Sequence, residues 1–239
     1  MKAWLFAAAW ALAAAPAAAP APRQVRVPTS DGWDLAGTLV PAGKKKAIVV
    51  LHGLASGKEE WQPLAEALAK RGVSTLALDL RGHGKSLKGG AALGWQSFTD
   101  HGPDGAWAAM WKDAEAGAGW LKAQGYKQIG LGGASVGANV VLDAAARLPK
   151  VRFLVLLSPG VDYQGLRAGA SILAYGPRPL LMAASAPDEY AFKSVDLLAR
   201  ARVEAGLPAD KLAASAGHGA QMFADPKTLA KIADWIAQQ

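Results

Sequence analysis

Short apolar runs alternate with longer amphipathic stretches along the chain from Val25 onward. The short runs are rich in Val, Ile and Leu and predict buried β-strands. They cover residues 47–51, 73–78, 126–131, 151–157, 179–183 and 211–214. The longer stretches repeat apolar positions at helical spacing and predict α-helices. They cover residues 58–70, 106–123, 136–148, 188–205 and 226–237. This alternation indicates βαβ units around a mainly parallel sheet in one α/β domain.

The start of the pattern predicts a different pairing of strands. Residues 24–27 and 33–40 flank Thr29-Ser30-Asp31-Gly32, a turn sequence that suits a hairpin. The sheet is therefore expected to open with antiparallel strands. Residues 82–104 are rich in glycine and polar side chains and predict a long loop that contains a short helix. The last helix is expected to turn Trp235 inward.

The first residues have the composition of a secretory signal peptide. Lys2 precedes an apolar run from Ala3 to Ala15, and small residues follow it. The run is shorter than the roughly 20 residues that span a bilayer, so a stable membrane anchor is not expected. Cleavage between Ala17 and Arg23 would divide the chain into a signal peptide over residues 1–22 and an exported domain over residues 23–239, periplasmic or extracellular. The chain has no cysteine, which excludes disulfides and a lipid-modified cysteine.

The net charge is +7, but it is not gathered into a basic patch along the sequence. The only run of like charges is Lys44 to Lys46, just before an apolar strand, where a solvated loop is the simpler interpretation. A protein that binds nucleic acid would concentrate its positive charge. Nucleic acid is therefore not an expected partner.

The strongest chemical signal is Gly133-Ala134-Ser135-Val136-Gly137, between a predicted strand and a predicted helix. This is the context of a nucleophile elbow, in which small residues let the backbone turn sharply and expose the serine hydroxyl. A glycine-rich turn that binds phosphate is the alternative. Neither G-x-G-x-x-G nor G-x-x-x-x-G-K-[ST] fits, because Ser135 takes the third glycine position of the first and no lysine closes the second.

Two further motifs accompany the elbow: His52-Gly53-Leu54 after one strand and Asp79-Leu80-Arg81-Gly82-His83-Gly84 after the next. With these three motifs, nearly all of the chain after the signal peptide resembles the α/β-hydrolase family. The resemblance implies a mostly parallel sheet of about eight strands with helices on both faces. It also implies that Ser135 is the nucleophile and that the backbone N–H groups of Leu54 and Val136 form the oxyanion hole. The loop reads His-Gly-Leu-Ala and so departs from the His-Gly-Gly-Gly of one lipase and esterase subgroup.

A serine hydroxyl needs a base within hydrogen-bond reach and a group that orients the base. His218, in Ala216-Gly217-His218-Gly219 after the last predicted strand, is the best candidate for the base. Asp188 follows the strand over 179–183, where the family's acid usually lies. Glu189 and Asp162 stay open as alternatives, and Asp188 could also act as a helix N-cap. The order serine, acid, histidine matches the family.

The other three histidines are not expected to be catalytic. His52 and His83 lie in glycine-flanked loops, which in the resembling family are structural supports, and His101 is expected on a loop surface. No cofactor or metal is expected. Four aromatic residues could line the pocket or belong to the core: Trp95, Phe98, Trp107 and Tyr163.

Only about 20 residues separate the strands over 151–157 and 179–183, too few for a large lid. An open site favours small-molecule esters, cleaved by acyl transfer through an acyl-enzyme on Ser135. The alternatives are a peptidase, a thioesterase or a dienelactone-type hydrolase with the same residues, or a non-catalytic exported binding protein of the same fold.

Overall fold

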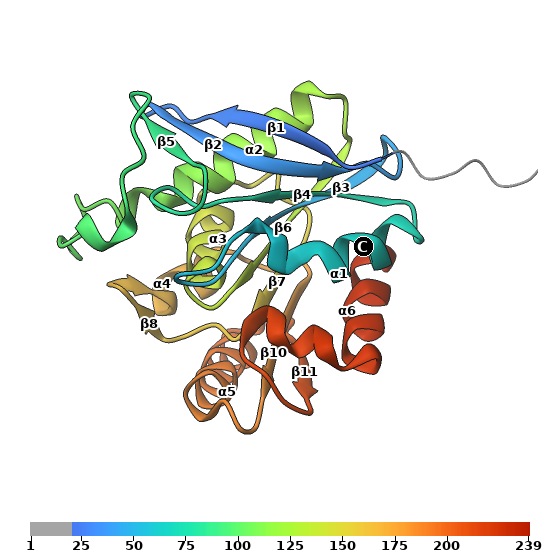
Figure 1. Ribbon diagram of the computed structural model, residues 1–239. Coiled ribbons are helices and arrows are strands. Elements are labelled where there is room, and N and C mark those ends of the chain that lie inside the picture. The colour runs from blue at the N-terminus through green and yellow to red at the C-terminus, as the bar shows by residue number, and fades with distance from the viewer. Residues whose placement is uncertain (1–20) are drawn as a thin grey trace, which may run out of the picture.

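A twisted sheet runs through the middle of the molecule (Figure 1). The structure is a computed structural model, and it describes residues 21–239. The strand order is β1-β2-β4-β3-β6-β7-β10-β11, with the short β5 paired to β2. The strands are β1 (Arg23–Pro28), β2 (Trp33–Val40), β3 (Lys46–Leu51), β4 (Val73–Leu78), β5 (Leu87–Lys88), β6 (Gln128–Ala134), β7 (Leu154–Leu157), β10 (Leu180–Ser185) and β11 (Asp210–Ala214). From β4 to β11 the neighbours are parallel, whereas β1, β2 and β4 pair antiparallel. The predicted fold and the opening hairpin are confirmed.

The centre of the sheet is apolar on both faces. In β3 every residue after Lys46 is fully buried, and β4 is buried along its whole length. A strand covered on both sides has no solvent face, which is why residues 47–51 of β3 form a continuous apolar run without alternation.

Helices cover the two faces unequally (Figure 1). On one face, α1 (Gln62–Ala69) packs beside α6 (Pro226–Gln238), and both share a core with Ile48 and Val50 of β3. On the other face lie α2 (Trp111–Ala123), α3 (Val136–Arg147), α4 (Ala168–Ala174) and α5 (Glu189–Glu204), around Val49 and Leu51. Short 3-10 helices occur at η1 (Lys58–Trp61), η2 (Trp95–Ser97), η3 (Ala108–Met110) and η4 (Gly219–Ala224). The predicted long helices 58–70 and 106–123 therefore each begin with a 3-10 turn.

Three details differ from the sequence expectations. β6 extends to Ala134, because Gly132 and Gly133 pair with β3 and β7 although glycine is a weak strand former. The loop over 82–104 contributes β5, which was not predicted, as well as the expected short helix. Trp235 packs its ring edge-on against the buried Phe153, as expected, but it is only half-buried, because its indole N–H donates to Asp210 at 2.8 Å at the rim of the core.

The connection between β7 and β10 contains only the two-stranded hairpin β8 (Asp162–Tyr163) and β9 (Leu166–Arg167), followed by α4. The expected minimal lid is thus one short hairpin and one short helix.

The predicted signal peptide lies outside the described residues, apart from its last two. Within residues 21–239, no helix has the length and apolar character needed to cross a bilayer.

Candidate active site

Ser135 lies in the turn between β6 and α3, with φ 54° and ψ −125°. Positive φ is rare for a residue with a side chain, and such strain persists only where the surroundings enforce it. Here the Ser135 N–H donates to the carbonyl of Leu157 in β7 at 2.8 Å. The turn therefore holds the serine at the carboxyl end of the sheet in a conformation that it would not adopt alone.

Two glycines of the motif allow this turn because backbone occupies the space of their side chains. A Cβ at Gly133 would lie 2.2 Å from the carbonyl oxygen of Gly137. A Cβ at Gly137 would lie 2.4 Å from the carbonyl oxygens of both Leu51 and His52. Since these neighbours are backbone atoms that cannot rotate away, the elbow packs directly onto the end of β3.

His218 follows β11 and is within hydrogen-bond distance of Asp188, the residue that precedes α5. The distance between His218 Nδ1 and Asp188 Oδ2 is 2.7 Å. The imidazole is 41% exposed and the carboxylate 15%. If Nδ1–H donates to the carboxylate, Nε2 is left unprotonated as an acceptor for the Ser135 hydroxyl. Asp188 is the N-cap residue of α5, as considered from the sequence, but its side chain makes no cap hydrogen bond to the helix.

The two alternative acids face other partners. Glu189 pairs with Lys193 one turn along α5 at 3.0 Å. Asp162 accepts the N–H of Gly165 at 2.9 Å and lies 3.4 Å from Arg167 in the β8–β9 hairpin. Of the three carboxylates, the geometry brings Asp188 to the histidine.

Residues 217–219, which we call the histidine loop, are held by two buried serines that the sequence analysis missed. Ser185 at the end of β10 donates its hydroxyl to the Gly217 carbonyl at 2.7 Å. Ser158, just after β7, accepts the N–H of Gly219 at 2.9 Å. Both serines are fully buried. A serine that ends an apolar strand was the available signal, because a buried hydroxyl must find a partner.

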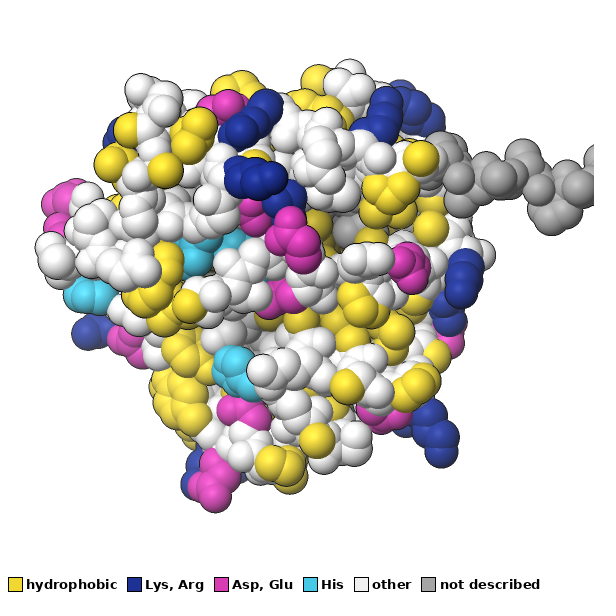
Figure 2. Space-filling model, in the orientation of Figure 1, with side chains coloured by type: hydrophobic (Ala, Val, Ile, Leu, Met, Phe, Trp, Pro, Cys, Tyr) yellow, Lys and Arg dark blue, Asp and Glu magenta, His cyan; other side chains and the backbone are white. Residues whose placement is uncertain are grey.

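Ser135 and His218 line one cavity of about 670 Å³. Its other lining residues are Gly53, Leu54, Ala55, Ser56, Glu60, Ala134, Gly219, Ala220 and Gln221. In the face shown in Figure 2, histidine side chains reach the surface near acidic and apolar ones. The serine and the histidine, 83 positions apart in the sequence, thus reach the same space.

The N–H groups of Leu54 and Val136 are free to bind a substrate oxygen. Leu54 lines the cavity, and Val136 is the first residue of α3, directly after Ser135. Within residues 21–239, neither N–H donates a hydrogen bond to another group. The start of a helix also carries partial positive charge, which favours a developing anion beside Val136. The oxyanion hole stays a prediction, for which these two N–H groups have no hydrogen-bond partner within the described residues.

Tyr163 of β8 borders the elbow. Burial raises the pKa of its hydroxyl, and the charge of Asp188 raises that pKa further. The phenol consequently stays protonated and donates, here to the Ser158 carbonyl at 3.4 Å.

Of the other aromatic candidates, Trp107 is buried in the core. Trp95 lies over His83 and lines a separate hollow of about 310 Å³ beside the main cavity. Phe98 packs edge-on against Trp107.

His52 and His83 support the loops, as expected. His52 accepts the N–H of Leu80 at 3.0 Å through Nε2 and contacts the Gly53 carbonyl at 2.7 Å through Nδ1. Burial lowers the pKa of His52 to about 4, so the ring is neutral at pH 7. His83 contacts the Arg81 carbonyl at 3.0 Å. His101 is exposed, as predicted.

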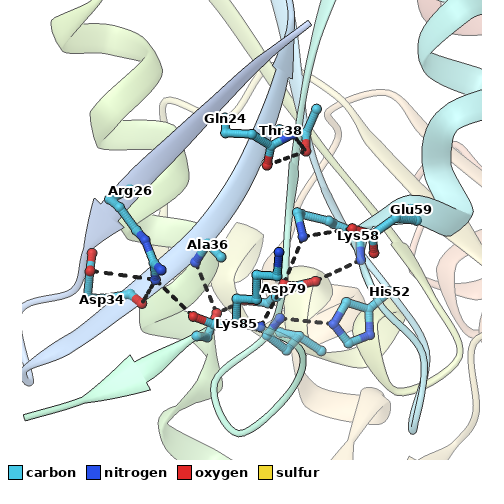
Figure 3. Close-up of polar contacts among 12 residues, drawn as sticks. Gln24, Arg26, Asp34, Ala36, Thr38, His52, Lys58, Glu59, Asp79 and Lys85 are labelled. Carbon is cyan, nitrogen blue, oxygen red and sulfur yellow. Dashed lines mark hydrogen bonds and ion pairs between the residues drawn. The ribbon is translucent and has the colours of Figure 1, made fainter. Parts of the chain in front are cut away.

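The buried carboxylate of Asp79 connects the loops that follow β3 and β4 (Figure 3). Asp79 accepts the backbone N–H and the ammonium of Lys58 at 2.9 and 3.0 Å, and the N–H of Lys85 at 3.0 Å. These bonds and the charge of Lys58 lower the pKa of Asp79 even though burial alone would raise it. Asp79 therefore stays charged and ties η1 to the end of β4. Among the described residues, no group of three or more His, Asp or Glu side chains could hold a metal ion.

Comparison with known proteins places the chain in a family. Residues 42–223 match the family described as Serine aminopeptidase, S33 (Hydrolase_4). The chain belongs to this family of α/β-hydrolases. The α/β-hydrolase is 30% identical over 122 residues to the thermostable monoacylglycerol lipase of a Bacillus species, which covers 51% of this chain and 44% of the relative. It is 33% identical over 132 residues to the sn-1-specific diacylglycerol lipase ABHD11 of Mus musculus, covering 54% and 38%. The matches span less than half the length of these two relatives.

Solved structures show the same fold. An esterase from Pyrococcus furiosus superposes with a TM-score of 0.74 and 20% identity, over 91% of each chain. A dienelactone hydrolase from Anabaena variabilis gives 0.68 and 20%, over 92% of this chain and 96% of the other. These likenesses extend across nearly the whole described part of this α/β-hydrolase.

Proposed function

We propose that this α/β-hydrolase cleaves carboxylic esters by acyl transfer through Ser135. The observation that carries the proposal is the cavity that Ser135 and His218 share, with Asp188 hydrogen-bonded to the far side of the imidazole. The names of the relatives, two lipases and an esterase, support an ester as the bond that is cleaved.

The geometry supports a two-step reaction. Nε2 of His218 takes the hydroxyl proton as Ser135 attacks the ester carbonyl, and the carbonyl oxygen becomes an oxyanion that the N–H groups of Leu54 and Val136 bind. The intermediate collapses, the imidazolium gives its proton to the departing alcohol, and an acyl-serine remains. Water then loses a proton to His218 and attacks the acyl carbon, which releases the acid and returns the proton to Ser135. Asp188 stabilises the imidazolium in both steps.

The test is turnover of p-nitrophenyl butyrate by the wild type and by Ser135→Ala. The variant should lose at least about 1,000-fold in kcat, because the nucleophile is gone. Its thermal unfolding should match the wild type or exceed it, since alanine removes no buried bond. Ser30→Ala, in the exposed β1–β2 turn, is the control and should retain full turnover. Undiminished turnover by Ser135→Ala rejects the proposal.

A second candidate is hydrolysis of an amide next to a free amino group. The carboxylate of Glu60 lines the cavity, and an ammonium group would be attracted to it. An aminoacyl p-nitroanilide tests this candidate directly. A kcat/KM for this anilide well above that for the same anilide with its amino group acetylated would make aminopeptidase the better description.

We further propose that the protein is exported, on the apolar run over residues 3–15 and the small residues after it. N-terminal sequencing of the protein from an expressing cell tests this. A mature end between Ala17 and Arg23 is the expected result, and recovery of the uncleaved chain alone contradicts it.

A further inference from the structure

A carboxylate that takes no part in the proposed reaction lies in the same cavity. Glu60 belongs to η1 and is partly buried. It and His218 are the only ionisable side chains among the residues that line the cavity. A negative carboxylate raises the energy of an oxyanion that forms nearby, since like charges repel. The presence of Glu60 in this cavity therefore calls for a separate explanation.

Glu60 holds the turn that presents Leu54. Its Oε1 accepts the N–H of Gly53 at 3.1 Å, and its Oε2 accepts the hydroxyl of Ser56. The N–H of Ser56 closes the turn on the Gly53 carbonyl at 3.2 Å. The carboxylate therefore bonds to the residue before Leu54 and to the second residue after it.

The turn needs such support because Ala55 within it has φ 57°. A residue with a Cβ rarely adopts this conformation, and it stays there only when neighbouring contacts fix it. The two bonds from Glu60 hold both ends of the turn, and His52 Nδ1 also contacts the Gly53 carbonyl. The strained residue directly follows the proposed oxyanion donor.

Within residues 21–239, no lysine or arginine side chain forms an ion pair with Glu60. The ammonium of Lys58 pairs with Glu59 and Asp79 instead, at 2.8 and 3.0 Å. Burial raises the pKa of Glu60, and its bonds to Ser56 and Gly53 and the nearby His218 offset this rise only in part. The two hydrogen bonds therefore act against burial and stabilise the carboxylate that accepts both donors.

We propose that Glu60 is a positioning residue that holds the Gly53–Ser56 turn so that the Leu54 N–H meets the oxyanion, and that its charge makes the cavity reject carboxylate-bearing esters. The proposal rests on the proposed ester hydrolysis and names a residue and a substrate preference of that site. The hydrogen bonds account for the positioning, and the unneutralised carboxylate accounts for the preference.

Two variants separate the bonds from the charge. Glu60→Gln can keep both bonds, because its amide oxygen accepts from Gly53 and its amide N–H₂ donates to the Ser56 oxygen. Glu60→Ala loses both. With p-nitrophenyl butyrate, Glu60→Ala should lower kcat by about 100-fold with KM changed less than about threefold, the cost of a misplaced oxyanion donor. Glu60→Gln should stay within about threefold of the wild-type kcat.

The matched control is Glu59→Gln, which removes the same charge from the adjacent residue of η1. Glu59 is 73% exposed and does not line the cavity, so kcat should be unchanged. Ser56→Ala removes one of the two bonds and should lower kcat by about fivefold. It keeps the positioning role testable if Glu60→Ala does not fold. Equal kcat for wild type, Glu60→Ala and Ser56→Ala overturns that role.

The charge is tested with p-nitrophenyl hemisuccinate, whose acyl chain ends in a carboxylate, against the neutral butyrate. Glu60→Gln should raise the ratio of kcat/KM for hemisuccinate to that for butyrate by about tenfold, and Glu59→Gln should not. A purely structural role would not move this ratio. An unchanged ratio in Glu60→Gln overturns the preference.

The rate at which a fluorophosphonate labels Ser135 gives a readout that needs no ester turnover. Glu60→Ala should slow labelling, because the phosphonyl oxygen occupies the oxyanion hole. If the wild type is labelled and Glu60→Ala is labelled equally fast, the inference fails while the proposed function stands. If the wild type is neither labelled nor active, both fail.

Discussion

The elbow and the histidine loop bring their functional residues to one cavity by opposite means. The elbow is fixed by backbone: Gly133 and Gly137 have no side chains, and carbonyl groups fill the space where these would lie. The histidine loop is fixed by side chains: Ser158, Ser185 and Asp188 each bond to one of its three residues. The first region depends on close packing and the second on directed hydrogen bonds.

This difference predicts where each region tolerates change. A close-packed turn fails as a unit when any atom is added, because its neighbours cannot move apart independently. A loop held by separate hydrogen bonds loses its order in steps, as each bond contributes about 1 kcal/mol. Substitutions in the elbow should therefore affect folding first, and those around the histidine loop should affect turnover first.

Gly137→Ala should have the largest effect. The added Cβ would meet two carbonyl oxygens at 2.4 Å, so the end of β3 and the start of α3 must separate. We expect a loss of about 3 kcal/mol or more in the free energy of unfolding, measured by urea denaturation.

Gly119→Ala is the matched control for that variant. It adds the same methyl group to an exposed site in α2 with no atom within 4 Å. Alanine is the better helix former, so stability should rise by about 0.5–1 kcal/mol. Equal responses from the two variants would contradict the packing account of the elbow.

Asp188→Asn should lower kcat by about 1,000-fold or more while stability changes little. The amide can present an N–H to the imidazole and favour the wrong tautomer, a change that costs about 10⁴ in a serine protease. Asp162→Asn and Glu189→Gln remove the two alternative acids and should leave kcat within about twofold. A large loss in either of them instead of in Asp188→Asn would reassign the orienting group.

Acidification should lower the free energy of unfolding through His52, whose carbonyl packs against the elbow. Its pKa is about 4 in the folded protein because of burial, against about 6.5 in the unfolded chain. Below pH 6.5 the unfolded state binds a proton that the folded state does not, so stability falls as pH drops from 6.5 towards 4, by up to about 3 kcal/mol.

Urea denaturation across this pH range, with the ring signals of His52 followed by NMR, measures the effect of acidification. The carbonyl of His52 lies where a Gly137 side chain would be, so the test also concerns the packing of the elbow. A His52 ring that titrates near pH 6.5 in the folded protein would contradict it.

Ser158→Ala and Ser185→Ala should have the smallest effects, about tenfold each in kcat with KM nearly unchanged. Each removes one bond that places His218, and the other bonds remain. Ser97→Ala, at an exposed position, is the control and should be silent. If either buried serine could be replaced without any change in kcat, its bond would not be needed to place the histidine.

The contrast also explains what the sequence could predict. The elbow is a local pattern: five consecutive residues between a strand and a helix contain the glycines that its packing requires. The central strand β3 was predictable for a similar reason, since it is buried on both faces and leaves a continuous apolar run. Ser135, His218 and Asp188 follow strand ends, and the carboxyl ends of parallel strands meet at one edge.

The supporting residues were not predictable, because their partners are distant in the chain. Ser158 bonds to a residue 61 positions away and Ser185 to one 32 positions away. Glu60 lies in a predicted helix among several charged residues, and nothing in the sequence distinguishes it from Glu59. The end of β6 was missed since the glycines that suit the elbow are poor strand formers, and pairing on both sides decides their conformation.

The most direct test of the central claim is the site at which a fluorophosphonate reacts with the intact protein. Intact-mass analysis and peptide mapping should show one adduct, on Ser135, because this hydroxyl is the one that His218 can activate. The adduct should be absent in Ser135→Ala. A wild type that stays unlabelled, or an adduct on any other serine, would contradict the account.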